Sequence, residues 1–264
     1  MILHLSSALA DVTEVVNLLI EANKDNKPIP IISDRFPHID ENAAYKIQNK
    51  FVKQRLENDN IAGFKAGLTS NKSQKKFGLE TPVAGVLLAS GKNKGSPIID
   101  IKNFKMPVIE TEIGFIIGKT INKPIQEINM LVDKIGAVVP VIEIPDIGFE
   151  DTKRVKGVDI IASNVGATDF IIGDEKLFKE IDINEIIVTL YFNGNVVNRG
   201  IATDAMGNQL KALLWLVNTI VNQGWEIEPD QILITGVLGK MIPGKQGKYF
   251  ANFGILGKIS FNVK

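Results

Sequence analysis

The stretch Val108–Gly118 reads VIETEIGFIIG and places Glu110 and Glu112 inside a β-branched, apolar run. A run of this kind, bounded by polar segments, predicts a buried β-strand. Alternate residues of a strand point to the same face, so the two carboxylates project side by side. Because isolated buried carboxylates are costly, they require solvent, a proton, a charged partner or a metal ion.

A second apolar segment carries a further carboxylate. Residues 137–144 read AVVPVIEI and hold Glu143 between Ile142 and Ile144. Three carboxylates on β-rich segments make a plausible all-oxygen site for Mg²⁺ or Mn²⁺, with positions left for water and substrate. An E-x-E pattern is also typical of the solvated face of an antiparallel sheet, and the Glu110–Glu112 pair alone favours that simpler interpretation.

Other β-branched runs alternate with Gly, Pro and Asn turns around these two segments. We expect further strands at 98–101, 170–173, 186–192, 231–236 and 254–263. Asn193-Gly194 directly follows one of these runs and precedes Val196-Val197, which predicts a two-residue hairpin.

The first 60 residues follow a helical pattern instead. Apolar residues at helical spacing predict one helix through Val12, Val15, Val16, Leu19 and Ile20, and a second through Ala44, Ile47 and Phe51. The connector Lys27–Pro37 separates them, and Asp40 is placed to cap the second helix. Two later helices are expected over 128–135 and 210–220, with Gly224 ending the latter.

This order of elements predicts an α+β fold with a curled or barrel-like β core. We expect a helical N-terminal subdomain at residues 1–60 and a β-rich domain at residues 61–264.

Composition narrows the possible functions. Thirty basic residues balance thirty acidic ones, so neither nucleic acid nor an anionic membrane is an expected partner. The absence of cysteine excludes disulfides and thiolate metal sites, and two histidines, His4 and His38, disfavour a His-rich zinc site or a Ser-His-Asp triad. Without a signal-like leader or a bilayer-length apolar run, the expected location is the cytoplasm.

The segment Gly63–Ser70 reads GFKAGLTS, and its two glycines around an aromatic residue and a lysine suggest backbone close to a ligand. Lys65 would then supply positive charge to a substrate carboxylate or a developing oxyanion. Taken alone, a glycine-rich turn with a surface lysine is the simpler interpretation. The segment does not match the P-loop pattern, so it predicts no phosphate site.

Together these segments resemble the 2-keto-4-pentenoate hydratase family of the fumarylacetoacetase-like superfamily. The resemblance covers nearly the whole chain in six ordered blocks: AAYKIQ (43–48), GFKAGLTS (63–70), VIETEIGFIIG (108–118), VVPVIEIPD (138–146), GNQLKALLWL (207–216) and ILITGVLG (232–239). It implies a fumarylacetoacetase-like core in which residues 61–264 form the catalytic domain, and a homo-oligomer.

The resemblance also implies roles for individual residues. Glu110, Glu112 and Glu143 would bind Mg²⁺ or Mn²⁺, and Lys65 would be the catalytic lysine. Substrate contacts are implied at or near five positions: Leu68, Thr69, Asn164, Thr235 and Gly236.

The activity that the resemblance implies is that of a hydro-lyase. A divalent metal would assist the addition of water to a 2-hydroxy-2,4-dienoate to give a 4-hydroxy-2-oxo acid. A 4-oxalocrotonate-type decarboxylase would use the same chelate. A fumarylacetoacetase-type C–C hydrolase usually needs a histidine to activate water, which this chain scarcely offers. A non-catalytic oxo-acid-binding protein is the alternative of a different class.

Several positions depart from the family's pattern. Val83 occupies the place of an aspartate, Ser163 and Gly166 replace an aspartate and a serine around Asn164, and Pro145 follows the Glu143-Ile144 pair. These changes leave the proposed metal ligands intact. They leave the substrate and the proton route open.

Overall fold

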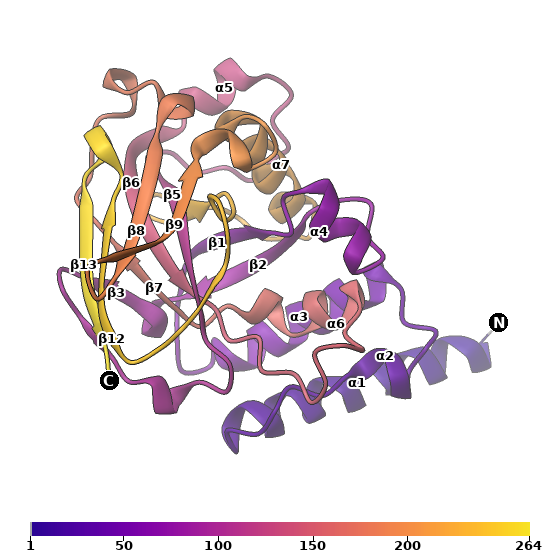
Figure 1. Cartoon of the computed structure of the whole chain (residues 1–264). Helices are drawn as coiled ribbons and strands as arrows, with labels where there is room; N and C mark the ends of the chain where they lie inside the picture. The colour runs from indigo at the N-terminus through magenta and orange to yellow at the C-terminus, as the bar shows by residue number, and fades with distance from the viewer. Residues whose placement is uncertain (1) are drawn as a thin grey trace.

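The fold is shown by a computed structural model that describes the backbone of residues 2–264 and the side chains of residues 11–264. Its strands form two sheets (Figure 1). The larger sheet has the spatial order β2 (Val83–Leu88), β1 (Ile61–Gly67), β10 (Ile232–Ile234), β5 (Val108–Ile117), β6 (Ile135–Ile144), β7 (Asp169–Ile172) and β3 (Lys92–Lys94), with β11 (Ile242–Pro243) pairing β5. The smaller sheet has the order β4 (Ile98–Ile99), β13 (Lys258–Val263), β12 (Gly247–Asn252), β8 (Ile187–Phe192) and β9 (Asn195–Ile201).

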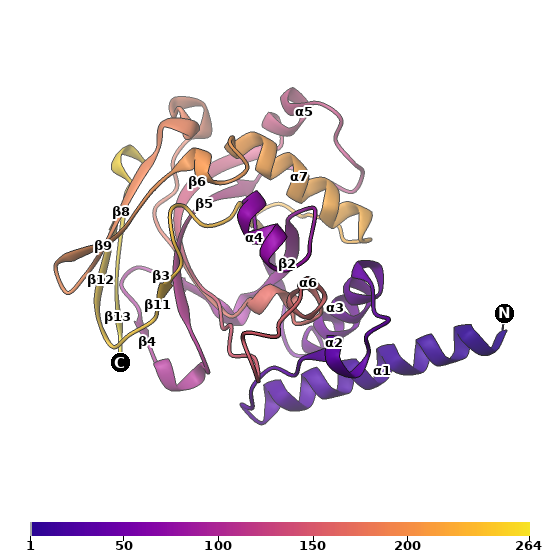
Figure 2. The same cartoon turned by 45° about the vertical axis from the view of Figure 1, so that its right-hand side comes forward.

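The helices lie mainly on the side of the larger sheet that faces away from the smaller one (Figure 2). They are α1 (Ile2–Lys24), α2 (Ile32–Arg35), α3 (Glu41–Arg55), α4 (Asn71–Lys76), α5 (Ile128–Val132), α6 (Gly157–Ala162) and α7 (Gln209–Asn222). Helix α7 packs on β1, β2 and β10, while α3 packs between α1 and α6. The curled sheet and the mixed helix content confirm the α+β class.

The pairing of β5 with β6 positions the acidic residues. Strands β5 and β6 pair antiparallel, with Glu110 directly opposite Glu143. Strand β10 pairs with the other edge of β5, and β1 lies parallel to β10, which aligns Lys65 with Ile234. Residues far apart in the sequence therefore meet on one side of neighbouring strands.

Several local predictions are confirmed. The Asp40 side chain accepts a 2.8 Å hydrogen bond from the Ala43 amide and caps α3. The Asn193-Gly194 turn joins β8 to β9, with positive φ at both residues, and Gly224 follows α7 with φ 85°.

Other local predictions are wrong in extent. Ile135 begins β6 instead of extending α5, because its pairing with Ile117 takes precedence over its helical spacing from Leu131. The expected strand at 98–101 ends at Ile99, and α2 lies within the expected connector. Helices α4 and α6 were not expected, since six-residue helices show almost no periodicity.

A continuous hydrophobic core joins the N-terminal helices to the sheets. It includes Val15 of α1, Ile47 of α3, Phe64 of β1 and Phe115 of β5, all buried. A domain division at residue 60 stays a prediction.

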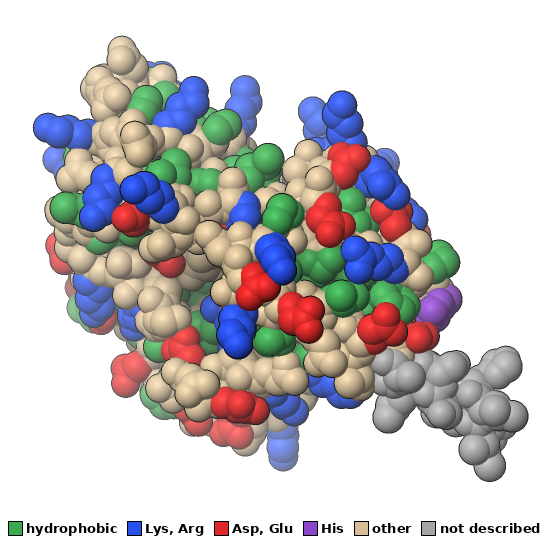
Figure 3. Space-filling model, turned by 90° about the horizontal axis from the view of Figure 1, so that it is seen from below, with side chains coloured by type: hydrophobic (Ala, Val, Ile, Leu, Met, Phe, Trp, Pro, Cys, Tyr) green, Lys and Arg blue, Asp and Glu red, His purple; other side chains and the backbone are tan. Residues whose placement is uncertain are grey.

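The charge pattern of one face and the lengths of the helices can be described directly. On the face seen in Figure 3, basic and acidic side chains are interspersed. Within the described part of the chain, no helix is both long enough and apolar enough to cross a bilayer.

Candidate metal centre

Three carboxylates converge between β5 and β6. One oxygen from each of Glu110, Glu112 and Glu143 lies within 4.8 Å of the others. Glu112 and Glu143 are fully buried and Glu110 is half-buried, so this face of β5 is not a solvated sheet face. The side-by-side projection of Glu110 and Glu112 follows from strand alternation, and Glu143 is added by the register of β6.

Lys65 of β1 reaches this cluster from two strands away. Its side chain is buried, and its ammonium donates to Glu143 Oε1 and, at 3.1 Å, to the carbonyl oxygen of Val165. Gly85 on β2 leaves room for the lysine stem, since a Cβ there would lie 3.2 Å from Lys65 Cγ. The surface-lysine interpretation of this segment is therefore wrong.

The cluster has unsatisfied acceptor capacity. The Gly236 amide donates a 2.7 Å hydrogen bond to Glu112 Oε2, but Glu112 Oε1 and Glu143 Oε2 are buried without a hydrogen-bond partner. Three ionised carboxylates and one ammonium carry a formal charge of −2. Because unpaired buried anions are costly, the site is suited to one divalent cation with oxygen ligands.

The pKa values express the same electrostatic conflict. Burial, followed by repulsion from Glu143, raises the pKa of Glu110 from 4.5 to about 7, although Lys65 opposes the shift. Burial and the charges of Glu143 and Glu110 raise the pKa of Glu112 well above its ordinary value. For Lys65, burial acts to lower the pKa, but the surrounding carboxylates outweigh it and the net shift is upward, so the amine stays charged.

A strained backbone segment holds the lysine from the opposite side. Asn164, Val165 and Gly166 have φ values of 59°, 55° and 65°, all in the left-handed region. A β-branched residue such as Val165 is rarely found there, and the strain costs on the order of 1–3 kcal/mol. This conformation presents the Val165 carbonyl to Lys65, and a Cβ at Gly166 would lie 2.7 Å from the Asp146 carbonyl oxygen. The Gly166 departure therefore suits this backbone.

A cavity of about 410 Å³ opens beside Lys65 and Glu110. Leu68 and Thr69, both implied as substrate contacts, line it. Leu68 has φ 54°, and its carbonyl oxygen accepts a 2.9 Å hydrogen bond from the Gln74 side chain. The end of β1 is thus held in a specific turn at the cavity wall.

The other three implied contacts do not line this cavity. The Asn164 side chain bonds to both the amide and the carbonyl of Val86, each at 2.8 Å. Thr235 donates to Gln209 at 2.6 Å, and Gly236 binds Glu112. In this structure these residues hold neighbouring parts of the site together.

The departure at residue 83 leaves an apolar group. Val83 is buried opposite Gly67 in the β1–β2 ladder and supplies no proton-transfer group. Among the described cavity-lining residues, Asp204 is the carboxylate other than Glu110. Its Oδ2 accepts from the amides of Ile201 at 2.9 Å and Gly239 at 2.8 Å. Sequence reasoning missed Asp204 and Val165, because loop conformation brings both to the cavity.

His38 does not take part in this site. Its exposed ring bonds to Asp11 at 2.8 Å, and it does not line the cavity. The side chain of His4 lies outside the described residues. The structure thus offers no histidine here for the C–C hydrolase alternative among the side chains it describes.

Comparisons with known proteins find relatives that match most of this chain. No family model matches the chain. It is 30% identical over 238 residues to 2-keto-4-pentenoate hydratase 2 of Dechloromonas aromatica (strain RCB), covering 88% of this chain and 89% of the relative. It is 27% identical over 256 residues to 2-oxo-hept-4-ene-1,7-dioate hydratase of Escherichia coli, covering 94% and 96%.

The comparison with solved structures shows that this fold is known. 4-Oxalocrotonate decarboxylase from Pseudomonas putida G7, solved with magnesium and adipate, superposes with a TM-score of 0.90 at 24% identity, covering 96% of this chain and 97% of that one. This likeness shows the fold. The 30% identity to a hydratase over most of both chains shows the family: the chain belongs to the 2-keto-4-pentenoate hydratase family.

Proposed function

We propose that the protein is a divalent-metal-dependent hydratase that adds water to a 2-hydroxy-2,4-dienoate and releases a 4-hydroxy-2-oxo acid. The observation that carries the proposal is the cluster of three glutamates, two of whose buried oxygens have no hydrogen-bond partner, beside Lys65 and a cavity. The hydratase names of its relatives support this reaction over others that use the same fold.

Glu110, Glu112 and Glu143 would hold the metal. When bound, a divalent cation supplies Lewis-acid stabilisation of negative charge on the substrate carboxylate and 2-oxygen. The magnesium in the decarboxylase structure supports a divalent ion of this kind. Either Mg²⁺ or Mn²⁺ fits an all-oxygen donor set.

Lys65 would bind and stabilise the acid end of the substrate. An ammonium group has three N–H donors, and two of them are directed to Glu143 and to the Val165 carbonyl. The third is free to donate to a substrate oxygen in the cavity that Lys65 lines. In the metal-free protein the surrounding carboxylates hold the pKa of Lys65 high, and its charged ammonium would stabilise the developing enolate.

Asp204 would move protons. Ketonisation of the dienol adds a proton to the diene carbon farthest from the 2-oxygen. Water then adds to the resulting enone at the carbon β to the 2-oxo group. A final proton goes to the α carbon, which lies between that carbon and the 2-oxo group. Amide donors from Ile201 and Gly239 hold Asp204 Oδ2 in place at the cavity. The Asp204 carboxylate would transfer protons directly or through water, in place of the aspartate that relatives carry at the position of Val83.

The same chelate and lysine suit a 4-oxalocrotonate-type decarboxylation, the reaction of a 25% identical relative from Pseudomonas sp. (strain CF600). Released CO₂ from an oxalocrotonate-type substrate, measured beside dienoate hydration, separates the two reactions.

Substitutions at Glu112 and Lys65 should separate metal binding from turnover. Glu112→Gln removes a charged ligand and should weaken Mn²⁺ binding and abolish hydration. Lys65→Met should retain Mn²⁺ binding, because it leaves all three carboxylates, yet lower kcat by about 10²–10³. Calorimetric Mn²⁺ titration and loss of dienol absorbance provide the two measurements. Full turnover by either variant, or by the wild type in EDTA, would contradict the proposal.

Asp204→Asn should lower kcat by about 10²–10⁴ while Mn²⁺ binding stays near the wild-type value. Asparagine can still accept the two amide hydrogen bonds, so the loop should keep its conformation. The measurements are kcat for dienoate hydration and a calorimetric Mn²⁺ titration of the same variant. An unchanged rate would remove Asp204 from the proton route.

Metal stabilisation should increase with pH. In the metal-free protein the raised pKa of Glu110 means that the folded state binds a proton there more tightly than the unfolded state does. Protonation of Glu110 therefore stabilises the fold fully below about pH 4.5, and this stabilisation is lost as the pH rises through about 7. Metal binds the deprotonated carboxylates, so the increase in Tm on adding Mn²⁺ should be larger at about pH 8 than at about pH 5.5. Equal increases at both pH values would contradict this electrostatic account. Glu110→Gln should weaken the pH dependence of the metal-free Tm.

A further inference from the structure

Much of the cavity wall is apolar. Apart from Lys65 and Glu110, much of its wall comes from half-buried or exposed apolar side chains in loops and short helices: Phe77, Ile147, Phe149, Val155, Ile160, Val237 and Met241. Hydroxyl groups of Ser70, Ser73 and Thr152 add polar points to the wall without adding charge. Half-buried apolar side chains around a cavity form a surface that an apolar ligand group would cover.

The cavity is large for the smallest substrate of this class. Its volume of about 410 Å³ lies in the range of roughly 300–1,000 Å³ typical of sites for drug-sized ligands. A five-carbon dienoate is small for this volume, so it would leave part of the apolar wall in contact with water. A longer substrate would displace that water and bury the wall.

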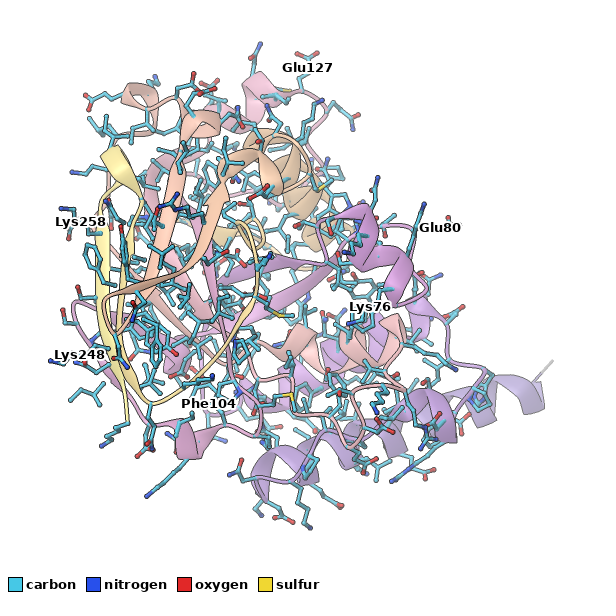
Figure 4. The ribbon with its side chains drawn as sticks, viewed as in Figure 1. Lys76, Glu80, Phe104, Glu127, Lys248 and Lys258 are labelled. Atoms are coloured by element: carbon cyan, nitrogen blue, oxygen red, sulfur yellow. The ribbon has the colours of Figure 1, made fainter. Side chains whose placement is uncertain are left out.

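The charges around the cavity disfavour a second carboxylate. Lys65 is already paired with Glu143, and the other cation in the described wall is Lys76. Lys76 is exposed on α4 (Figure 4). Its ammonium lies 4.8 Å from the Phe77 ring centroid. Glu110 and Asp204 add negative charge. A distal carboxylate inside the cavity would therefore lack a buried counter-ion, which is costly.

We infer that the substrate carries an apolar substituent, alkyl or aryl, at the end remote from its 2-oxygen, and not a second carboxylate. The inference rests on the proposed function for the orientation of the substrate, with its acid end at Lys65 and the glutamates. This substrate preference would differ from that of a relative whose name gives a 1,7-dioate as its substrate.

Binding of saturated 2-oxo acids tests the inference without turnover. With Mg²⁺ present, calorimetry on the wild-type protein should show affinity increasing by up to roughly fourfold for each methylene added from 2-oxobutanoate to 2-oxooctanoate. 2-Oxoheptanoate should bind at least tenfold more tightly than the chain-matched 2-oxoheptanedioate. Equal or tighter binding of the dioate would overturn the inference.

Hydration rates give the second measurement. For dienoates of matched length, kcat/KM should be at least tenfold higher with a distal alkyl group than with a distal carboxylate. Met241→Arg places a cation at the exposed edge of the apolar wall and should shift this ratio toward the dioate. Met241→Gln is the matched neutral control and should shift it less.

The outcomes distinguish the inference from the function on which it rests. Hydration of the dioate at an equal or higher rate overturns the apolar tail and leaves the hydratase standing; loss of that preference in Lys76→Gln would then assign the carboxylate to Lys76. Failure to hydrate any dienoate, including the five-carbon one, overturns the proposed function. Tighter binding of long-chain 2-oxo acids would still support the apolar subsite in that case.

Discussion

Mutual repulsion among three closely spaced carboxylates is the constraint on which the rest of this site depends. Glu110, Glu112 and Glu143 lie close enough to share one ion, and little water reaches them to screen their charges, because Glu112 and Glu143 are fully buried and Glu110 is half-buried. Lys65 offsets one charge and the Gly236 amide donates to one oxygen, while one buried oxygen each of Glu112 and Glu143 has no hydrogen-bond partner. The site is therefore a preformed cluster of anionic oxygens whose net formal charge of −2 matches one divalent cation.

The surrounding structure maintains this arrangement at a cost in backbone strain. Val165 adopts a left-handed conformation that is unfavourable for a β-branched residue, and its carbonyl then holds Lys65. Asn164 fixes the same segment to β2 through both polar atoms of its side chain. Strained backbone of this kind persists only where neighbouring contacts impose it, and it is found most often at functional sites.

The sequence predicted the parts of the site that depend on local geometry. Strand alternation placed Glu110 and Glu112 on one face, and the apolar run around Glu143 indicated an interior position. The partnership of Lys65 with Glu143 was not predictable, since it depends on β10 lying between β1 and β5. The family resemblance indicated Lys65, but no local pattern indicated its burial.

Elements with little periodicity were the ones that sequence reasoning missed. Helix α6 is six residues long, and Asp159, buried within it, bonds to Ser33 from a distant segment. Loop residues such as Asp204 reach the cavity through tertiary packing that single-sequence patterns do not encode. The apolar wall has the same origin, because Phe149, Ile160 and Val237 come from separate segments.

The most direct test of this account is a crystal structure grown with Mn²⁺, with anomalous diffraction data collected near the manganese absorption edge. The account predicts one strong anomalous peak per chain between Glu110, Glu112 and Glu143, within about 2.0–2.3 Å of an oxygen from each. A map without a peak there, in which the three carboxylates instead bond to one another or to Lys65 alone, would contradict the claim that this cluster is a metal centre.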